Sequence, residues 1–405
     1  MIETIEGGSI TSVAGFHASG VACGLKGDNA LDLALVHSTA PCHAAAVFTT
    51  NRFPAAPVLY DRALLVENPA GLRAVIINSG CANACTGDQG IKNTERSADL
   101  VATALKIPAE SVFVMSTGVI GAQLPMATMQ RGISLAARSL SDDGGHAAAR
   151  AIMTTDTRPK ETAIRMELGG QQVAIAGMAK GAGMIHPRMA TMLSVIVTDA
   201  AVETGLLEKG LREAVEHSFH RITIDGDTST NDTILLLANG IAGNAQLATD
   251  DWEDYRHFVE ALTQVCTTLS QAIVRDGEGA TKYVEIEVRG ARSQDQALQA
   301  AMSVARSSLV KTALFGEDAN WGRVLAAVGY SGVEVDPNRT ALWFGDEQVV
   351  ENGQPLGANE DKLKKILSCI DIRITVDLGL GEGEVVVWTS DLSFDYVKIN
   401  AHYRT

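Results

Sequence analysis

Strand-like and helix-like segments follow one another in this chain without a regular alternation, and that order limits the folds open to it. Short apolar runs between turn residues predict strands, and apolar residues recurring at three- and four-residue spacing predict helices. The predicted strands are 74–77, 112–115, 173–176, 193–197, 371–376 and 383–388, and the predicted helices are 93–105, 205–217, 251–273 and 296–314. A doubly wound parallel sheet needs strand and helix to alternate, so the pattern favours an α+β fold built in layers.

The length of the chain and one change of pattern suggest how it divides. It has 405 residues, enough for two or three domains. The alternating segment 285–288 leads into the polar stretch 289–296, and we place a boundary near residue 281. We therefore expect a smaller C-terminal domain at 281–405. The tail beyond Ser390 contains a phenylalanine and two tyrosines, which a frayed end rarely does, so we expect it to dock.

Charge and composition exclude several classes of partner and site. The formal net charge is −15, and such an acidic surface repels nucleic acid and anionic lipid. The acidic N-terminus does not resemble a secretory signal, and no apolar run is long enough to span a membrane. Six scattered cysteines fit reduced thiols in a cytoplasm. Cys81 and Cys85 lack a second ligand pair at zinc-like spacing, so we expect no metal site.

One segment, 180–193, invites a chemical explanation. It reads Lys-Gly-Ala-Gly-Met-Ile-His-Pro-Arg-Met-Ala-Thr-Met-Leu, a glycine-rich turn that ends at a threonine opening an apolar strand. The plain interpretation is a loop leading into a buried strand, with Thr191 as a good strand former. The chemical interpretation is that the Thr191 hydroxyl attacks the carbonyl of Ala190 and breaks the chain there. Taken alone, the segment favours the plain interpretation.

Chain breakage before Thr191 would make this residue a complete catalytic unit. Its hydroxyl is the nucleophile, and its new α-amine, with an ordinary pKa of about 8, accepts the proton of that hydroxyl. The β-branch limits χ1 and holds the hydroxyl in few orientations. The small side chain of Ala190 leaves the pocket open. No histidine is needed, and the lone histidines form no Ser/His/Asp pattern.

The same segment resembles the signature of the ornithine acetyltransferases, also called the arginine biosynthesis bifunctional proteins. The resemblance covers nearly the whole chain. Other matching segments are 14–16 with 20–22, 78–84, 116–121, 154–157, 225–232, 276–282, 320–323 and 395–400. One such match would be weak, but this many in the same order are very specific.

The resemblance implies a self-cleaving enzyme with a layered αββα architecture. Cleavage between Ala190 and Thr191 gives fragments 1–190 and 191–405, with 191–280 carrying the nucleophile at its start, and two copies of each fragment assemble. Thr191 takes acetyl from N-acetylornithine, and glutamate then takes it from Thr191. Some members also acetylate glutamate from acetyl-CoA, and the sequence leaves open whether this chain does. No cofactor and no metal are implied.

The resemblance also implies roles for the other site residues. The Thr117 hydroxyl and the Gly118 amide form the oxyanion hole, which stabilises charge on the reacting carbonyl oxygen. The implied substrate contacts are Thr154, Lys180, Thr191, Glu278, Asn400 and Thr405. A lysine suits the substrate carboxylate and a glutamate its ammonium. The plain alternatives are a strand-to-turn exit at 117–118, solvated surface charges at Lys180 and Glu278, and a disordered end at Asn400 and Thr405.

Two further features qualify the resemblance. The run 225–232 looks like a loop for a hard cation, but the glutamate that closes a calcium loop is missing, so we interpret it as turn and capping chemistry near the active site. Ala182, Arg188 and His402 stand where we expect Ser, Asn and an acidic residue. None of these changes removes the nucleophile, the oxyanion pair, Lys180 or Glu278.

Two other functions compete with acetyl transfer. The first is an N-terminal-threonine amidohydrolase or aminopeptidase, in which water takes the acyl group from Thr191. Transfer instead needs a site that excludes water and holds an amine acceptor. The second is a non-catalytic binding protein, which predicts an intact chain of 42.7 kDa. The signature around Thr191 favours the transferase over both.

Overall fold

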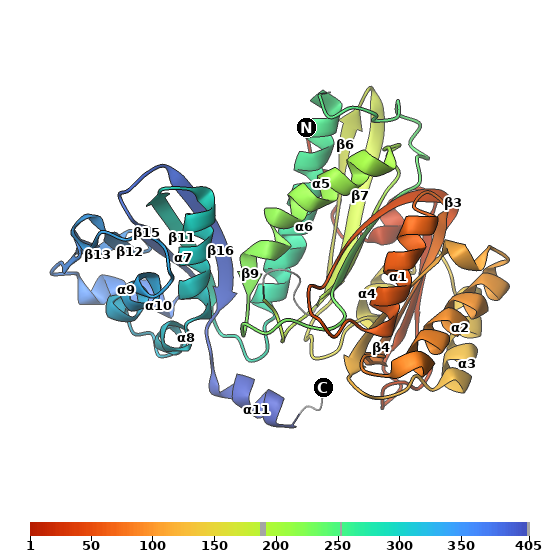
Figure 1. The fold of residues 1–405 in the computed structure, drawn as a ribbon, viewed down its shortest axis with the longest axis horizontal. Helices are drawn as coiled ribbons and strands as arrows, with labels where there is room; N and C mark the ends of the chain where they lie inside the picture. The colour runs from red at the N-terminus through yellow and green to blue at the C-terminus, as the bar shows by residue number, and fades with distance from the viewer. Residues whose placement is uncertain (187–191, 252, 403–405) are drawn as a thin grey trace.

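The computed structural model describes residues 1–186, 192–251 and 253–402, and these ranges form a layered body followed by a smaller C-terminal unit (Figure 1). The strands of the body are β1 (Glu3–Thr4), β2 (Phe16–Val21), β3 (Leu33–Phe48), β4 (Leu72–Cys81), β5 (Val112–Val119), β6 (Lys160–Leu168), β7 (Gln171–Lys180), β8 (Leu193–Thr198) and β10 (Thr233–Ala238). Its helices are α1 (Ala56–Glu67), α2 (Gly87–Leu105), α3 (Met126–Arg138), α4 (Gly145–Ala151), α5 (Thr204–Glu216) and α6 (Glu253–Arg275).

The long strand β3 links two sheet layers into one hydrogen-bonded path. Among the described residues the strand order is β1-β6-β7-β8-β10-β3-β4-β5, and β2 also pairs with β3. The first half of β3 pairs with β2 and β4, whereas its second half pairs with β10. The register against β4 shifts between His37 and Cys42, at the passage from one half to the other. One strand therefore takes part in both layers.

Alternating side chains show how the layers stack. On β8, Leu193 and Val195 pack in the cluster between the two sheets, and Ile196 packs in the cluster beneath α5 and α6. On β5, Phe113 enters the same inter-sheet cluster, while Val114 faces α2 and α3. Successive residues of a strand point to opposite faces, so strands buried on both faces become the continuous apolar runs seen in the sequence. The resulting order is helix, sheet, sheet, helix, which confirms the expected αββα sandwich.

The C-terminal unit has its own sheet and its own apolar core. Its sheet has the order β14-β13-β12-β15-β11-β16-β9 in the part of the chain described. These elements are β9 (Ile222–Thr223), β11 (Tyr283–Ala291), β12 (Ala341–Phe344), β13 (Glu347–Glu351), β14 (Gln354–Pro355), β15 (Asp371–Asp377), β16 (Gly383–Ser390), α7 (Gln294–Arg306), α8 (Ser308–Phe315), α9 (Trp321–Gly329) and α10 (Glu360–Ser368). The short strand β9 comes from the body and pairs with β16, which joins the units. A smaller α+β unit is thus confirmed, while the boundaries at 190/191 and 280/281 stay predictions.

Most predicted elements are present, but the single helix predicted over 296–314 is wrong. The structure has α7 and α8 there, separated at Ser307. The Ser307 backbone is extended, and its side chain accepts a hydrogen bond from the Val310 amide. A serine in this conformation caps the start of a helix, so it ends one helix and begins the next. The apolar spacing continues across Ser307, so the periodicity of apolar residues does not reveal the break between the two helices.

The tail ends in α11 (Phe394–His402), which lies near both units (Figure 1). No residue of this helix, all of which the structure describes, is buried. It is held by polar contacts and by an edge-to-face contact of Phe394 with Phe315. Within the described ranges, no helix combines the length and the apolar character needed to cross a membrane.

Candidate active site

One cavity brings together the site residues that the sequence predicted. Five segments supply them: the end of β5, the loop before β6, the end of β7, the loop after α6, and α11. The six that the structure describes all line this cavity: Thr117, Gly118, Thr154, Lys180, Glu278 and Asn400. They come from segments far apart in the sequence, so their meeting is a property of the fold.

The other three predicted residues, Ala190, Thr191 and Thr405, lie outside the described residues. The chain is described again from Met192, directly before β8. The Met192 amide donates a 2.9 Å hydrogen bond to Asp232 Oδ1, and Asp232 is fully buried. Among the described residues, Asp232 Oδ2 has no hydrogen-bond partner. Burial raises the pKa of the Asp232 carboxyl well above its ordinary value, although the Met192 amide opposes this.

Parallel pairing of β4 with β5 shapes the predicted oxyanion hole. Gly80 is paired with Gly118, and both have positive φ angles, of 109° and 133°. A Cβ on Gly118 would lie 2.3 Å from the carbonyl carbon of Gly80. Only glycine allows this approach, and it also leaves the Gly118 amide uncovered by a side chain. Thr117 precedes it and lines the cavity as a buried residue, 4% exposed.

Lys180 stands at the end of β7 with its side chain buried. Its residue exposure is 2%, so the interpretation of Lys180 as a solvated surface charge is wrong. Lys180 Nζ donates to Thr117 Oγ1 over 3.4 Å. Burial lowers the pKa of the Lys180 ammonium, and the Asp156 carboxylate opposes that shift. A buried lysine therefore borders the predicted oxyanion hole.

Asp156 ties the segments of Thr154 and Lys180 together. Its carboxylate accepts hydrogen bonds from the Thr154 amide at 2.9 Å and the Gly181 amide at 2.7 Å. It also accepts one from Lys160 Nζ at 2.6 Å. Burial alone would raise the pKa of Asp156, but the Lys180 and Lys160 ammonium groups outweigh it and hold that pKa at about 2. Asp156 is therefore a carboxylate near neutral pH.

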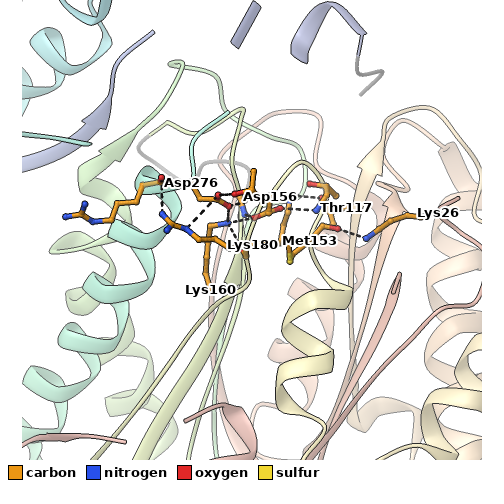
Figure 2. Close-up of polar contacts among 12 residues, drawn as sticks. Lys26, Thr117, Met153, Asp156, Lys160, Lys180 and Asp276 are labelled. Atoms are coloured by element: carbon orange, nitrogen blue, oxygen red, sulfur yellow. Dashed lines mark hydrogen bonds and ion pairs between the residues drawn. The ribbon is translucent and has the colours of Figure 1, made fainter. Parts of the chain in front are cut away.

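Lys160 extends this network to the loop of Glu278. Figure 2 shows its ammonium between the carboxylates of Asp156 and Asp276. The distance from Lys160 Nζ to Asp276 Oδ2 is 2.5 Å, and Asp276 also accepts from the amide and hydroxyl of Thr157. A buried cation between two carboxylates is stable only when its hydrogen bonds are satisfied, as they are here. Lys160 thus links the loop before β6 to the loop after α6.

Glu278 faces the cavity from a turn that packs on the glycine-rich loop. Its amide donates to the Ala182 carbonyl at 2.8 Å, and a Cβ on Gly183 would lie 2.4 Å from Glu278 Oε2. Asn400 Nδ2 donates to Glu278 Oε2 at 2.7 Å. The tail helix therefore contacts the cavity through Asn400.

A search of protein families places the chain by sequence as well. The model of the ArgJ family matches residues 17–405. The chain belongs to the ArgJ family. It is 51% identical to the arginine biosynthesis bifunctional protein ArgJ of Symbiobacterium thermophilum, over 100% of both chains. It is 49% identical to that of Thermotoga neapolitana, over 96% of this chain and 99% of the relative.

Two solved structures also match. The ArgJ crystal structure from Bacillus halodurans is 41% identical, with a TM-score of 0.49 over 51% of this chain and 96% of that one. The ornithine acetyltransferase from Mycobacterium tuberculosis, solved with ornithine, is 42% identical, with a TM-score of 0.43 over 46% of this chain and 98% of that one.

The ArgJ-like loop 225–232 supports the cavity through turn contacts. Asp225 accepts hydrogen bonds from the amides of Met184 and Ile185, and the Tyr396 hydroxyl contacts its Oδ2 at 3.2 Å. Burial raises the pKa of Asp225, and these amides oppose the shift. The loop thus holds Met184 and Ile185, within the signature segment, through backbone hydrogen bonds.

Sequence reasoning missed three residues of this ArgJ site. Asn231 donates to the carbonyls of Ala82 at 2.7 Å and Ser116 at 2.8 Å, and so joins its loop to β4 and β5. Asp156 lies inside the matching segment 154–157, so its place in that motif could have indicated that it belongs to the site. Lys160 had no signal, because a lysine that opens a strand usually reaches solvent.

Proposed function

We propose that this chain transfers an acetyl group from N-acetylornithine to glutamate through an acetyl ester on Thr191. As a member of the ArgJ family, it is an acetyltransferase enzyme of arginine biosynthesis. The observation that carries the proposal is the cavity lined together by Thr117, Gly118 and Lys180. Thr191 directly precedes Met192 in the sequence, and we infer that its hydroxyl acts together with the oxyanion donors.

The first reaction is self-cleavage. The Thr191 hydroxyl adds to the Ala190 carbonyl carbon, the C–N bond breaks, and an ester forms. Water then hydrolyses this ester, which leaves a carboxylate on Ala190 and a free α-amine on Thr191. The amine is the base for later steps, because its pKa lies near neutral pH. The fragments 1–190 and 191–405 remain together through β8, which pairs with β7 across the break.

The second reaction is acetyl transfer in two halves. Thr191 Oγ1 attacks the acetyl carbonyl of N-acetylornithine, and its proton passes through the α-amine to the departing ornithine nitrogen. The amine of glutamate then attacks the acetyl ester, and Thr191 regains its proton. Each half builds negative charge on the carbonyl oxygen. The Thr117 hydroxyl and Gly118 amide donate hydrogen bonds to that oxygen, each worth roughly 2.7–4 kcal/mol of the barrier.

Charged groups of the cavity suit substrates that are amino acids. We assign the substrate carboxylate to Lys180 and the ornithine ammonium to Glu278, which Asn400 orients through its 2.7 Å hydrogen bond. Thr154 and the tail residue Thr405 complete the proposed contacts. Burial of Lys180 strengthens its interaction with a carboxylate, because the surrounding dielectric is low.

Several finer features belong to the same proposal. We propose that two copies of each fragment assemble, that the enzyme works in the cytoplasm, and that it needs neither metal nor cofactor. Acetyl-CoA is proposed as a second donor for glutamate, in keeping with the word bifunctional in the names of its relatives. Neither nucleic acid nor membrane is a proposed partner.

The experiment that tests the proposal compares Thr191→Ala with Thr191→Ser. Loss of the hydroxyl should leave one chain of 42.7 kDa without acetyl transfer, whereas serine keeps the hydroxyl and should still cleave. A denaturing gel and an assay with labelled N-acetylornithine measure both. Cleavage and transfer by Thr191→Ala would contradict the proposal. Equal ornithine release with and without glutamate would instead indicate a hydrolase.

A further inference from the structure

A line of alternating charges runs behind the predicted oxyanion hole. It begins at Asp276, passes Lys160 and Asp156, and ends at Lys180, whose ammonium contacts the Thr117 hydroxyl (Figure 2). All four charged residues are buried, with residue exposures between 2% and 8%. Burying two ammonium groups and two carboxylates is costly unless each has a partner of opposite charge. The alternating order supplies such partners, and its cost calls for a functional reason.

We propose that Asp156, held in place by Lys160, is a positioning residue that keeps the Lys180 ammonium charged and thereby points the Thr117 hydroxyl at the oxyanion. The inference rests on the proposed function, because it assumes that Thr117 belongs to the oxyanion hole. It adds a second role for Lys180 beside the binding of a substrate carboxylate.

The direction of the Thr117 hydroxyl follows from the inventory of donors. A lysine ammonium has three N–H donors and no acceptor, so in its contact with Thr117 the lysine donates and Oγ1 accepts. The hydroxyl proton of Thr117 is then directed away from Lys180 and toward the cavity that Thr117 lines. Neutral lysine has a lone pair that accepts from a hydroxyl, so loss of its charge would turn the Thr117 proton away from the oxyanion.

The charge of Lys180 depends on the groups around it. Burial lowers the pKa of Lys180, and Lys160 lowers it as well, whereas Asp156, Asp232 and Glu278 raise it. Lys26 is a further cation within electrostatic range. Burial raises the pKa of Asp232 well above its ordinary value. Asp156, with a pKa of about 2, is a charged counter-ion near neutral pH.

Position as well as charge depends on Asp156. Its carboxylate holds the Gly181 amide, which directly follows Lys180 in the chain, and the Thr154 amide on the facing loop. Lys160 fixes this carboxylate at 2.6 Å and is itself fixed by Asp276 at 2.5 Å. Asp156 therefore holds the backbone next to Lys180 and also places a negative charge near the Lys180 ammonium.

The test is the pH profile of kcat and KM for acetyl transfer in Asp156→Asn, from about pH 6 to about pH 10.5, between the ordinary pKa values of histidine and lysine. Asparagine keeps the shape and one acceptor oxygen but removes the charge. The alkaline limb of kcat should move down by about one pH unit or more, as expected when a neighbouring negative charge that raises the pKa of Lys180 is lost. The acid limb, which the Thr191 amine sets, should stay. An unmoved alkaline limb, or a rise in KM alone, would overturn the inference.

Two more variants make the test complete. Asp61→Asn applies the same change to another buried carboxyl, which accepts from the Val114 amide away from the cavity, and should leave the alkaline limb in place. An equal shift in this control would overturn the inference. If Asp156→Asn stays uncleaved, Asp276→Asn takes its place. With Asp276 neutral, the Lys160 charge offsets more of the Asp156 charge. The alkaline limb of kcat should then move down as well, but by less than in Asp156→Asn. An unmoved alkaline limb would contradict the inference.

Parallel assay of Thr191→Ala separates this inference from the proposed function. An active Thr191→Ala enzyme would remove the proposed function and the inference with it. An inactive Thr191→Ala together with an unmoved limb in Asp156→Asn would remove the inference alone.

Discussion

At the scale of single residues, the site depends on a threonine and a glycine whose roles differ. Gly118 is required by space, because its φ of 133° and its approach to Gly80 leave no room for a Cβ. The role proposed for Thr117 is chemical, because its hydroxyl accepts from Lys180 and keeps a proton to donate. The motif predicted roles for these residues, but the proximity of Lys180 to Thr117 is visible only in the fold.

Thr117→Val tests the chemical role, since valine has nearly the shape of threonine without the hydroxyl. If Thr117 supplies one oxyanion donor, kcat should fall roughly 100- to 1000-fold with little change in KM. Steady-state kinetics measure this, and Thr117→Ser, which keeps the hydroxyl, is the matched control. A valine variant as active as the serine variant would show that Thr117 donates nothing to the transition state.

At the scale of elements, apolar runs predicted the strands well because both faces of those strands are buried. The runs at 74–77 and 193–197 became β4 and β8, extended at their ends. The break at Ser307 was missed because a cap changes the backbone without changing the spacing of apolar residues. The site was predictable as a set of motifs, but Lys160 was not, since its burial follows from the pairing of β6 with β7.

Helix α11 is expected to contribute to substrate binding but little to the stability of the fold. It supplies Asn400 to the site, yet none of its residues is buried. Truncation after Ser393 should therefore raise KM for N-acetylornithine and lower kcat/KM, while the midpoint of thermal unfolding changes little. Kinetics and calorimetry on the same preparation measure both. A large fall in the unfolding midpoint would contradict the idea that α11 serves only the site.

At the scale of the whole molecule, a buried lysine makes stability depend on pH. Lys311 Nζ contacts the Thr389 hydroxyl and the Ser390 carbonyl in the C-terminal unit. Burial lowers the pKa of Lys311 to about 7, and Asp391 and Asp225 oppose this in part. Between that value and the ordinary lysine pKa of about 10.4, the unfolded chain binds more protons than the folded one. Its contribution to stability therefore increases as pH rises through this window.

Lys311→Met removes this titration. The unfolding midpoint of the wild type should rise relative to that of the variant between about pH 7 and about pH 10. Thermal unfolding at several pH values measures the difference. Lys92→Met, an exposed position on α2, is the control and should keep the slope of the wild type. Parallel pH profiles for the wild type and Lys311→Met would show that Lys311 is charged in the folded protein.

The central claim is that the acetyl group passes through Thr191 at a new chain end. Intact-mass spectrometry of the purified protein, after N-acetylornithine is added without glutamate, tests it most directly. We predict a fragment beginning Thr-Met-Leu-Ser that gains one acetyl group on Thr191 and loses it when glutamate is added. Absence of that fragment, or an acetyl group on another residue, would contradict the account.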